Sequence, residues 1–156
     1  IHGMSQRGGA VSTHIRFGRE NICSPVVERG SADLLVAFEK LEAARFIEYL
    51  RVGGRIVLSD QEILTSPMLT GASAYPQHME RTLAAAADTT YIPVQSLANG
   101  LGGTKFANVI LLGAAVKLLG LEDIAWDAVI KDNVRPEFAA QNIAALQLGM
   151  KEAASL

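Results

Sequence analysis

Several kinds of side chain are scarce in this 156-residue chain, and each scarcity argues against a class of function. The single cysteine, Cys23, allows no intrachain disulfide and is too few for an iron–sulfur cluster or a structural zinc site. The three histidines, His2, His14 and His78, are far apart and lack ligand-like spacing. We therefore predict no metal site in this chain. The cysteine usage favours a reducing, cytoplasmic setting.

The chain also has no strong excess of positive or negative charge, few aromatic rings and no long apolar run. The 14 basic and 16 acidic side chains nearly balance, which argues against a broad basic face for nucleic acid. Aromatic residues make up only 6% of the chain, too few for a base-stacking surface. The longest apolar run, Val109–Val116, is far shorter than the roughly 20 residues that span a bilayer. We predict a buried core helix there, with no nucleic-acid or membrane partner.

Apolar runs and breakers alternate in the manner of an α/β domain. Alternating apolar residues predict a strand at Val11–Phe17, and further strands are predicted at Asp33–Phe38, Arg55–Ser59 and Thr90–Val94. Helices are expected at residues 39–50, where Gly53-Gly54 follows as the stop, and at 76–87, 104–119, 122–131 and 136–154. Residues 61–75 are expected to be irregular, and Pro76 to open the helix that follows. The sequence predicts a three-layer α/β/α fold with a mainly parallel, Rossmann-like sheet.

In such sheets ligands bind beyond the carboxyl ends of the strands. Glu39 and Lys40, which follow the strand at 33–38, and Asp60, which follows Ser59, are therefore candidate site residues. For Glu39 we favour a structural interpretation, a carboxylate in the first turn of a helix, where the helix dipole stabilises negative charge. Glu42 and Arg45 are three residues apart and are predicted to form a solvated pair.

The sequence around the other candidate residues does not indicate a catalytic or binding role for them. His14 is predicted to be a packed or half-exposed histidine, and Cys23 has no neighbouring His or basic cluster in sequence that would activate its thiol. Gly100–Gly103 resembles a phosphate-binding turn only loosely, so we interpret 101–105 as a connection in which Lys105 is the one charged residue. Nucleophile-elbow, Walker and HExxH motifs are missing. We predict no catalytic residue and no self-sufficient active site.

The most informative segment is the opening loop Ser5, Gln6, Arg7, Gly8 and Gly9. Glycines let the backbone approach another molecule closely, and the Arg7 guanidinium suits a carboxylate, a phosphate or carbonyl groups. A glycine-rich connection whose polar side chains satisfy nearby backbone groups is the structural alternative. We favour a contact role, toward either a ligand or a partner subunit.

The segment His2–Gly9, continued by Val11–Arg16, resembles the signature of the 2-oxoacid:ferredoxin oxidoreductases, and specifically their gamma-type domain (the pyruvate/ketoisovalerate oxidoreductase catalytic domain). The resemblance is closest to the beta subunit of indolepyruvate ferredoxin oxidoreductase. It runs along the whole chain through Ser24-Pro25, Ala32–Leu35, Glu39, Leu41–Ala43, Gly53-Gly54, Ala107–Val109, Leu111–Ala114, Pro136, Phe138 and Asn142. Family members begin earlier, with a glycine-rich strand, turn and helix. We therefore expect residues 1–156 to be one gamma-type domain truncated at its N-terminus.

The resemblance implies an oxidative decarboxylation. A 2-oxoacid, here indolepyruvate, reacts with coenzyme A to give acyl-CoA, carbon dioxide and reduced ferredoxin. It further implies that thiamine diphosphate and the iron–sulfur clusters belong to a companion alpha-type subunit, that coenzyme A is a co-substrate, and that ferredoxin meets the whole complex. On this basis Ser5, Gln6, Arg7, Gly8 and Gly9 are expected to face coenzyme A or the partner. The isolated chain is expected to be inactive.

Two other hypotheses remain open. The chain could be a noncatalytic assembly or coenzyme A-binding module of a pyruvate or 2-oxoglutarate oxidoreductase, which holds a partner without touching substrate. A free-standing nucleotide-binding protein is disfavoured, because the expected glycine fingerprint is missing from this sequence.

Overall fold

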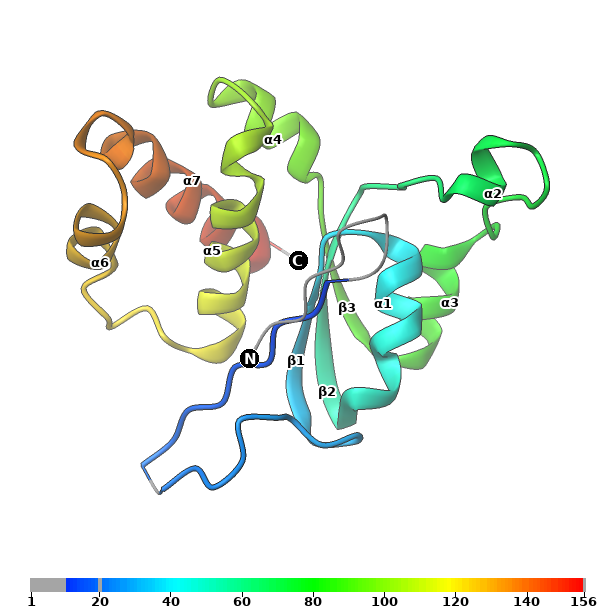
Figure 1. Cartoon of the computed structure of the whole chain (residues 1–156). Coiled ribbons are helices and arrows are strands. Elements are labelled where there is room, and N and C mark those ends of the chain that lie inside the picture. The colour runs from blue at the N-terminus through cyan, green and yellow to red at the C-terminus, as the bar shows by residue number, and fades with distance from the viewer. Residues whose placement is uncertain (1–10, 20, 156) are drawn as a thin grey trace.

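The computed structural model describes residues 11–19 and 21–155. Three parallel strands form a sheet in the order β1 (Ala32–Ala37), β2 (Leu50–Ser59) and β3 (Asp88–Ile92). Helices α1 (Lys40–Phe46) and α3 (Met79–Ala86) cover one face, and α5 (Ala107–Leu119) and α7 (Pro136–Ala154) cover the other (Figure 1). The predicted three-layer α/β/α fold with a parallel sheet is confirmed. The opening loop Ser5–Gly9 lies outside the described residues.

The central strand β2 divides the core between the two faces of the sheet. Successive side chains of a strand point to opposite faces, and Ile56, Val57 and Leu58 are all completely buried. Ile56 and Leu58 pack with residues of α1 and α3, whereas Val57 packs with Ile110 and other apolar residues of α5 and α7. A strand buried on both sides appears in sequence as a continuous apolar run, which is why the second half of β2, Arg55–Ser59, was predicted correctly.

Gly53-Gly54 belongs to β2 and was wrongly predicted to be a helix stop. Ala32 pairs with Leu50 but Leu34 pairs with Arg55, so β2 carries extra residues at this point and forms a bulge. Gly53 adopts φ +74°, and a Cβ on Gly54 would lie 2.7 Å from Leu50 Cγ. The bulge therefore needs both glycines, and the preceding helix ends earlier, in the 3₁₀ turn Ile47–Tyr49.

Helices α5 and α7 cross in close contact, with a glycine from each at the crossing. A Cβ on Gly113 would lie 2.9 Å from the carbonyl carbon of Leu146, and one on Gly149 would lie 2.8 Å from that of Ile110. Ile110, Leu111 and Val116 of α5 are fully buried, which confirms the predicted core helix.

No single helix among residues 11–19 and 21–155 is both long and apolar enough to cross a bilayer. The helix α4 (Val94–Gly100) and the segment Thr104–Leu119 together have the length and composition of a span, but they are bent by 116° relative to each other.

Three further predicted elements have other bounds in the structure, and two of these differences have identifiable reasons. Pro93 lacks the N–H that a strand needs, so β3 ends at Ile92 and Val94 starts α4, a helix that the sequence analysis missed. Helix α3 starts at Met79 and not at Pro76, because His78 takes a left-handed conformation with φ 59°. The predicted helix at 122–131 is α6 (Trp126–Asn133). The C-terminal helix was predicted with the bounds that α7 has.

The predicted strand Val11–Phe17 was also wrong, since only Thr13 makes an isolated bridge. Apolar and polar residues do alternate in this segment, but the apolar side chains are the exposed ones. Ser12 and His14 are half-buried, whereas Val11, Ile15 and Phe17 are 60%, 74% and 64% exposed. Residues 11–27 form an extended arm that leaves the body and returns to β1 (Figure 1). We call this segment, without residue 20, the N-terminal arm.

Candidate functional site

Buried charged side chains gather where the strands end, on the α1 and α3 side of the sheet. Glu39 and Lys40, directly after β1, are only 5% and 6% exposed. Charged groups removed from water need hydrogen-bonding partners. Glu62, Tyr75 and Glu80 supply these partners, and Tyr91 in turn donates to Glu80. We call these six residues the strand-end cluster.

Glu39 holds two segments at once. Its Oε2 accepts a hydrogen bond of 2.8 Å from the backbone N–H of Glu42, which caps the N-terminus of α1. Its Oε1 accepts from the Tyr75 hydroxyl and, at 3.4 Å, from the backbone N–H of Ile63. Burial and the hydrogen bond to Glu39 raise the pKa of Tyr75 well above its usual range. The structural interpretation of Glu39 holds, although the residue occupies the N-cap and not the first turn.

Lys40 is the electrostatic centre of the cluster. Its Nζ donates to Glu62 Oε1 at 2.9 Å and to Glu80 Oε1, and its side chain is 8% exposed. Burial lowers the pKa of Lys40, but hydrogen bonds to Glu80, Tyr91 and Glu62 outweigh it, so the pKa lies well above the usual value. The hydrogen bond from Lys40 lowers the pKa of Glu80, which also accepts from the Tyr91 hydroxyl at 2.8 Å. Lys40 is therefore a bound cation and not a proton donor or acceptor near neutral pH.

Asp60 lies at the end of β2 but is not part of the strand-end cluster. Its Oδ1 accepts a 3.3 Å hydrogen bond from the backbone N–H of Gln95, in the first turn of α4. Its own N–H donates to Ile92 O at 3.2 Å. These bonds tie β2 to the β3–α4 junction. The structure therefore unites Glu39 and Lys40 in one cluster, and gives Asp60 a helix-capping role.

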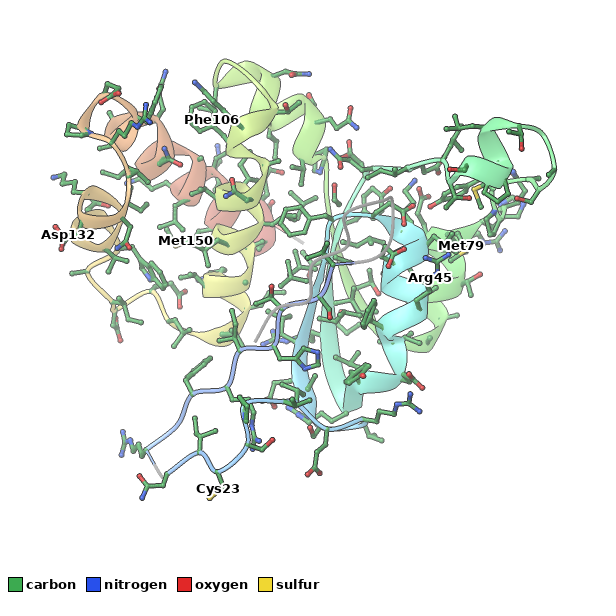
Figure 2. All side chains as sticks on the ribbon, in the orientation of Figure 1. Cys23, Arg45, Met79, Phe106, Asp132 and Met150 are labelled. Carbon is green, nitrogen blue, oxygen red and sulfur yellow. The ribbon has the colours of Figure 1, made fainter. Side chains whose placement is uncertain are left out.

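The N-terminal arm carries the next two candidates. The Nδ1 atom of His14 accepts a 3.2 Å hydrogen bond from the Val27 N–H, and its ring meets Tyr49 edge-on at 5.4 Å, which confirms a packed histidine. Cys23 is exposed at the outer end of the arm, on the opposite side of the molecule from Met79 (Figure 2). A shallow depression of about 420 Å³ separates the limbs of the arm and is lined by His14, Ile15, Arg16, Ile22 and Pro25.

The remaining charged candidates are in structural contacts. Lys105 Nζ lies 4.3 Å from the centre of the Phe138 ring, a cation–π contact that links the start of α5 to α7. The residues before it form a turn in which Gly102 and Gly103 have positive φ, as a connection requires. Arg45 and Glu42 form the predicted pair at 2.6 Å, with the Arg45 side chain half exposed.

The donor set of the described residues does not fit a metal or cluster. Within residues 11–19 and 21–155, no group of three or more His, Cys, Asp or Glu side chains is placed to hold a metal ion. The one thiol of the sequence cannot supply the four thiolates of an ordinary iron–sulfur cluster.

Four residues of the cluster were not predicted as site residues: Glu62, Tyr75, Glu80 and Tyr91. Glu62, Tyr75 and Glu80 are 22 to 40 residues from their partners in the chain and form no motif. The position of Lys40 directly after a buried strand did indicate that carboxylates must lie near it. The sequence did not indicate which carboxylates these are.

The fold and the strand-end cluster define a class, an α/β/α domain in which the buried residues Glu39 and Lys40 are both bound by other groups of the same chain. The sequence profile of the pyruvate ferredoxin/flavodoxin oxidoreductase family matches residues 1–152, and the chain belongs to this family. The resemblance inferred from His2–Gly9 is thereby confirmed.

Curated relatives are similar along nearly the whole chain. The indolepyruvate oxidoreductase subunit IorB of Thermococcus kodakarensis is 33% identical over 98% of this chain and 78% of its own length. The subunit of the same name from Pyrococcus horikoshii is 31% identical with the same coverage.

Solved structures share the fold. The gamma subunit of a keto/oxoacid ferredoxin oxidoreductase from Geobacter sulfurreducens matches with a TM-score of 0.60 and 22% identity, over 81% of this chain and 67% of that one. The 2-oxoglutarate:ferredoxin oxidoreductase of Magnetococcus marinus matches with a TM-score of 0.62 and 18% identity, over 88% of this chain and 22% of that one.

Proposed function

We propose that this chain is a subunit of a 2-oxoacid:ferredoxin oxidoreductase that acts on indolepyruvate. The carrying observation is the similarity to indolepyruvate oxidoreductase subunits, at 33% identity over 98% of the chain. The proposed complex converts the 2-oxoacid and coenzyme A to acyl-CoA and carbon dioxide, and passes the electrons to ferredoxin. We place it in the cytoplasm, and we take residues 1–156 as one gamma-type domain. The expectation of an N-terminal truncation stays a prediction.

The chemistry of the proposed complex belongs to a companion alpha-type subunit. Thiamine diphosphate there would supply the carbanion chemistry of decarboxylation, and iron–sulfur clusters there would carry the electrons. The described residues support this division, because the buried charges Glu39 and Lys40 are both bound within the fold. We therefore propose that the isolated chain is inactive and works by contact with the companion.

The contact would be made beside the opening loop Ser5–Gly9. Although this loop lies outside the described residues, it leads into the N-terminal arm, where Val11, Ile15 and Phe17 are each 60% or more exposed. Three large apolar side chains on the outer side of an extended segment are typical of a surface that a partner covers. We propose that Gln6 and Arg7 make polar contacts there, to the companion or to coenzyme A.

The substrate proposal is tested by co-expressing this chain with its companion subunit and measuring coenzyme A-dependent reduction of ferredoxin. We expect indolepyruvate to be oxidised at least ten times more efficiently than pyruvate or 2-oxoglutarate. A preference for either of these acids would favour the alternative assignment to another oxidoreductase. Lack of activity with all three would contradict the proposal.

The contact role of Arg7 is tested in the same complex. We expect Arg7→Ala to weaken assembly or to raise the KM for coenzyme A several-fold. The matched control is Arg29→Ala, because Arg29 makes only an exposed pair with Glu48 at 3.2 Å. If Arg7→Ala and Arg29→Ala both leave assembly and kinetics unchanged, the opening loop is a structural connection.

A further inference from the structure

The segment from Gln61 to His78 connects β2 to α3 and contains the short helix α2 (Ser66–Leu69). We call it the β2–α3 loop. We propose that this loop is a second docking element, and that its occupant is an apolar surface of the companion subunit. This inference rests on the proposed function, since it requires that the chain be part of a complex.

The length and composition of the loop are unusual for a connection exposed to water. It runs for 18 residues with one helix of four residues, and connections longer than about 12–15 residues without secondary structure of their own are uncommon and usually either functional or disordered. Residues 63–77 include no Asp, Glu, Lys or Arg. At the 19% charged content of the whole chain, a run of this length would carry about three charges. Recognition of a phosphate or a carboxylate would call for cations, so the chemistry of this loop suits an uncharged surface.

The apolar side chains of the loop point away from the core. Ile63, Leu64 and Leu69 are 59%, 46% and 70% exposed. Figure 1 shows α2 projecting at the edge of the molecule, beyond α3 and away from the sheet. The loop is folded on itself, with Leu69 N donating to Thr65 O at 2.9 Å and Ala72 N to Pro67 O at 2.8 Å. A single exposed leucine is ordinary, but three large apolar side chains on an uncharged projection mark an interaction surface.

The strand-end cluster fixes both ends of this loop. At its start, Gln61 O accepts from the Lys40 N–H at 3.3 Å and Glu62 accepts from Lys40 Nζ at 2.9 Å. At its far end, the Tyr75 hydroxyl donates to Glu39, and Lys40 Nζ also holds Glu80, just beyond the loop. The dipeptide Glu39-Lys40 therefore clamps the two ends together. A loop fixed before binding loses less conformational entropy when a partner covers it.

A companion chain suits this loop better than a second copy does. The loop is a projection and needs an apolar hollow on its occupant. Two depressions on the described surface of this chain include charged side chains, Arg16 in one, and Arg51 and Asp88 in the other. The same fold also occurs as about a fifth of the longer 2-oxoglutarate:ferredoxin oxidoreductase chain.

The test measures binding of the purified companion subunit to variants of this chain. Leu69→Asp adds a charge to the exposed tip, and Ile63→Ser is a milder second variant. Val52→Asp is the matched control, because Val52 is 99% exposed and lies on β2 next to the bulge, far from the strand-end cluster. We expect Leu69→Asp to weaken binding at least tenfold, Ile63→Ser about threefold, and Val52→Asp not at all.

The outcomes separate this inference from the proposed function. If the unmodified chain does not bind the companion, the proposed function fails, and this inference with it. If the unmodified chain binds and both loop variants bind within a factor of two of it, only the docking role of the loop is refuted. Loss of self-association in Leu69→Asp without loss of companion binding would assign the loop to a second copy and also overturn the proposal.

Discussion

Replacing either glycine at the α5–α7 crossing should strongly destabilise the fold. In an ordinary helix position, Gly→Ala stabilises a protein by about 0.5–1 kcal/mol. At Gly113, however, the new Cβ would lie 2.9 Å from Leu146 C, and closer still to Leu146 O. Ordinary contacts begin near 3.4 Å, and neither neighbour is a side chain that can rotate away. The helices would have to move apart, and such overpacking costs typically 1–3 kcal/mol.

We expect the upper end of that range, about 3 kcal/mol, because both clashing groups are backbone. For a chain of this size that loss lowers Tm by roughly 6–12 °C. Gly149→Ala should behave alike, since its Cβ would meet Ile110 C at 2.8 Å. Each change forces the same separation of α5 and α7, so the double variant should lose less than the two single losses combined.

The matched control is Gly100→Ala, at the end of α4, where a Cβ would have nothing within 4 Å. Its Tm should stay the same or rise slightly. Thermal unfolding followed by circular dichroism, with urea unfolding as a second probe, measures all four variants. A Gly113→Ala variant as stable as Gly100→Ala would refute the packing argument.

Two further predictions concern the strand-end cluster and its surroundings. His78 has φ 59°, a left-handed conformation that strongly disfavours β-branched residues. In urea unfolding, His78→Val should therefore lower the free energy of unfolding by about 1–2 kcal/mol, while His78→Gly should leave it almost unchanged. Equal losses in the two variants would contradict this. The hydrogen bond from Lys40 lowers the pKa of Glu80 below its ordinary 4.5, so that contribution to stability is present above pH 4.5 and declines as the pH falls through the folded-state pKa. The pKa of Lys40 lies above its ordinary 10.5, so its contribution is complete below pH 10.5 and declines only at higher pH. Lys40→Met should flatten both the acid and the alkaline limb of the stability–pH curve. The control is Lys117→Met, because Lys117 makes an exposed pair with Glu122. Identical curves for the two variants would refute the role of Lys40.

Local sequence predicted the parts of the fold that depend on local chemistry. The buried strands β1 and β2 appear as continuous apolar runs, and α7 starts at a proline in its first position. Errors arose where an element depends on its partner. Val11–Phe17 has the alternation of a strand, yet a strand requires a neighbouring strand, and the apolar side of this segment faces outward. Periodicity reports that one side of a segment is apolar, but not what covers it.

The candidate site was predictable to a similar degree. The topology rule for parallel sheets directed attention to Glu39, Lys40 and Asp60, and all three lie at strand ends. Sequence could not show that Asp60 caps α4, because that helix was itself missed. Nor could it find Tyr75 and Glu80, which reach Glu39 and Lys40 only after the chain has passed through β2 and the β2–α3 loop.

The charged side chains of the strand-end cluster hold parts of the fold together. The carboxyl ends of parallel strands are where such folds ordinarily bind small molecules. Here Glu39 and Lys40 are 5% and 6% exposed and hold the ends of a projecting loop, Glu39 through the Tyr75 hydroxyl and Lys40 through Glu62 and Glu80. Exposed apolar side chains of the N-terminal arm and of the β2–α3 loop are available for recognition. Both surfaces suit another protein better than a small charged substrate, which is why we assign the reaction centre to the companion subunit.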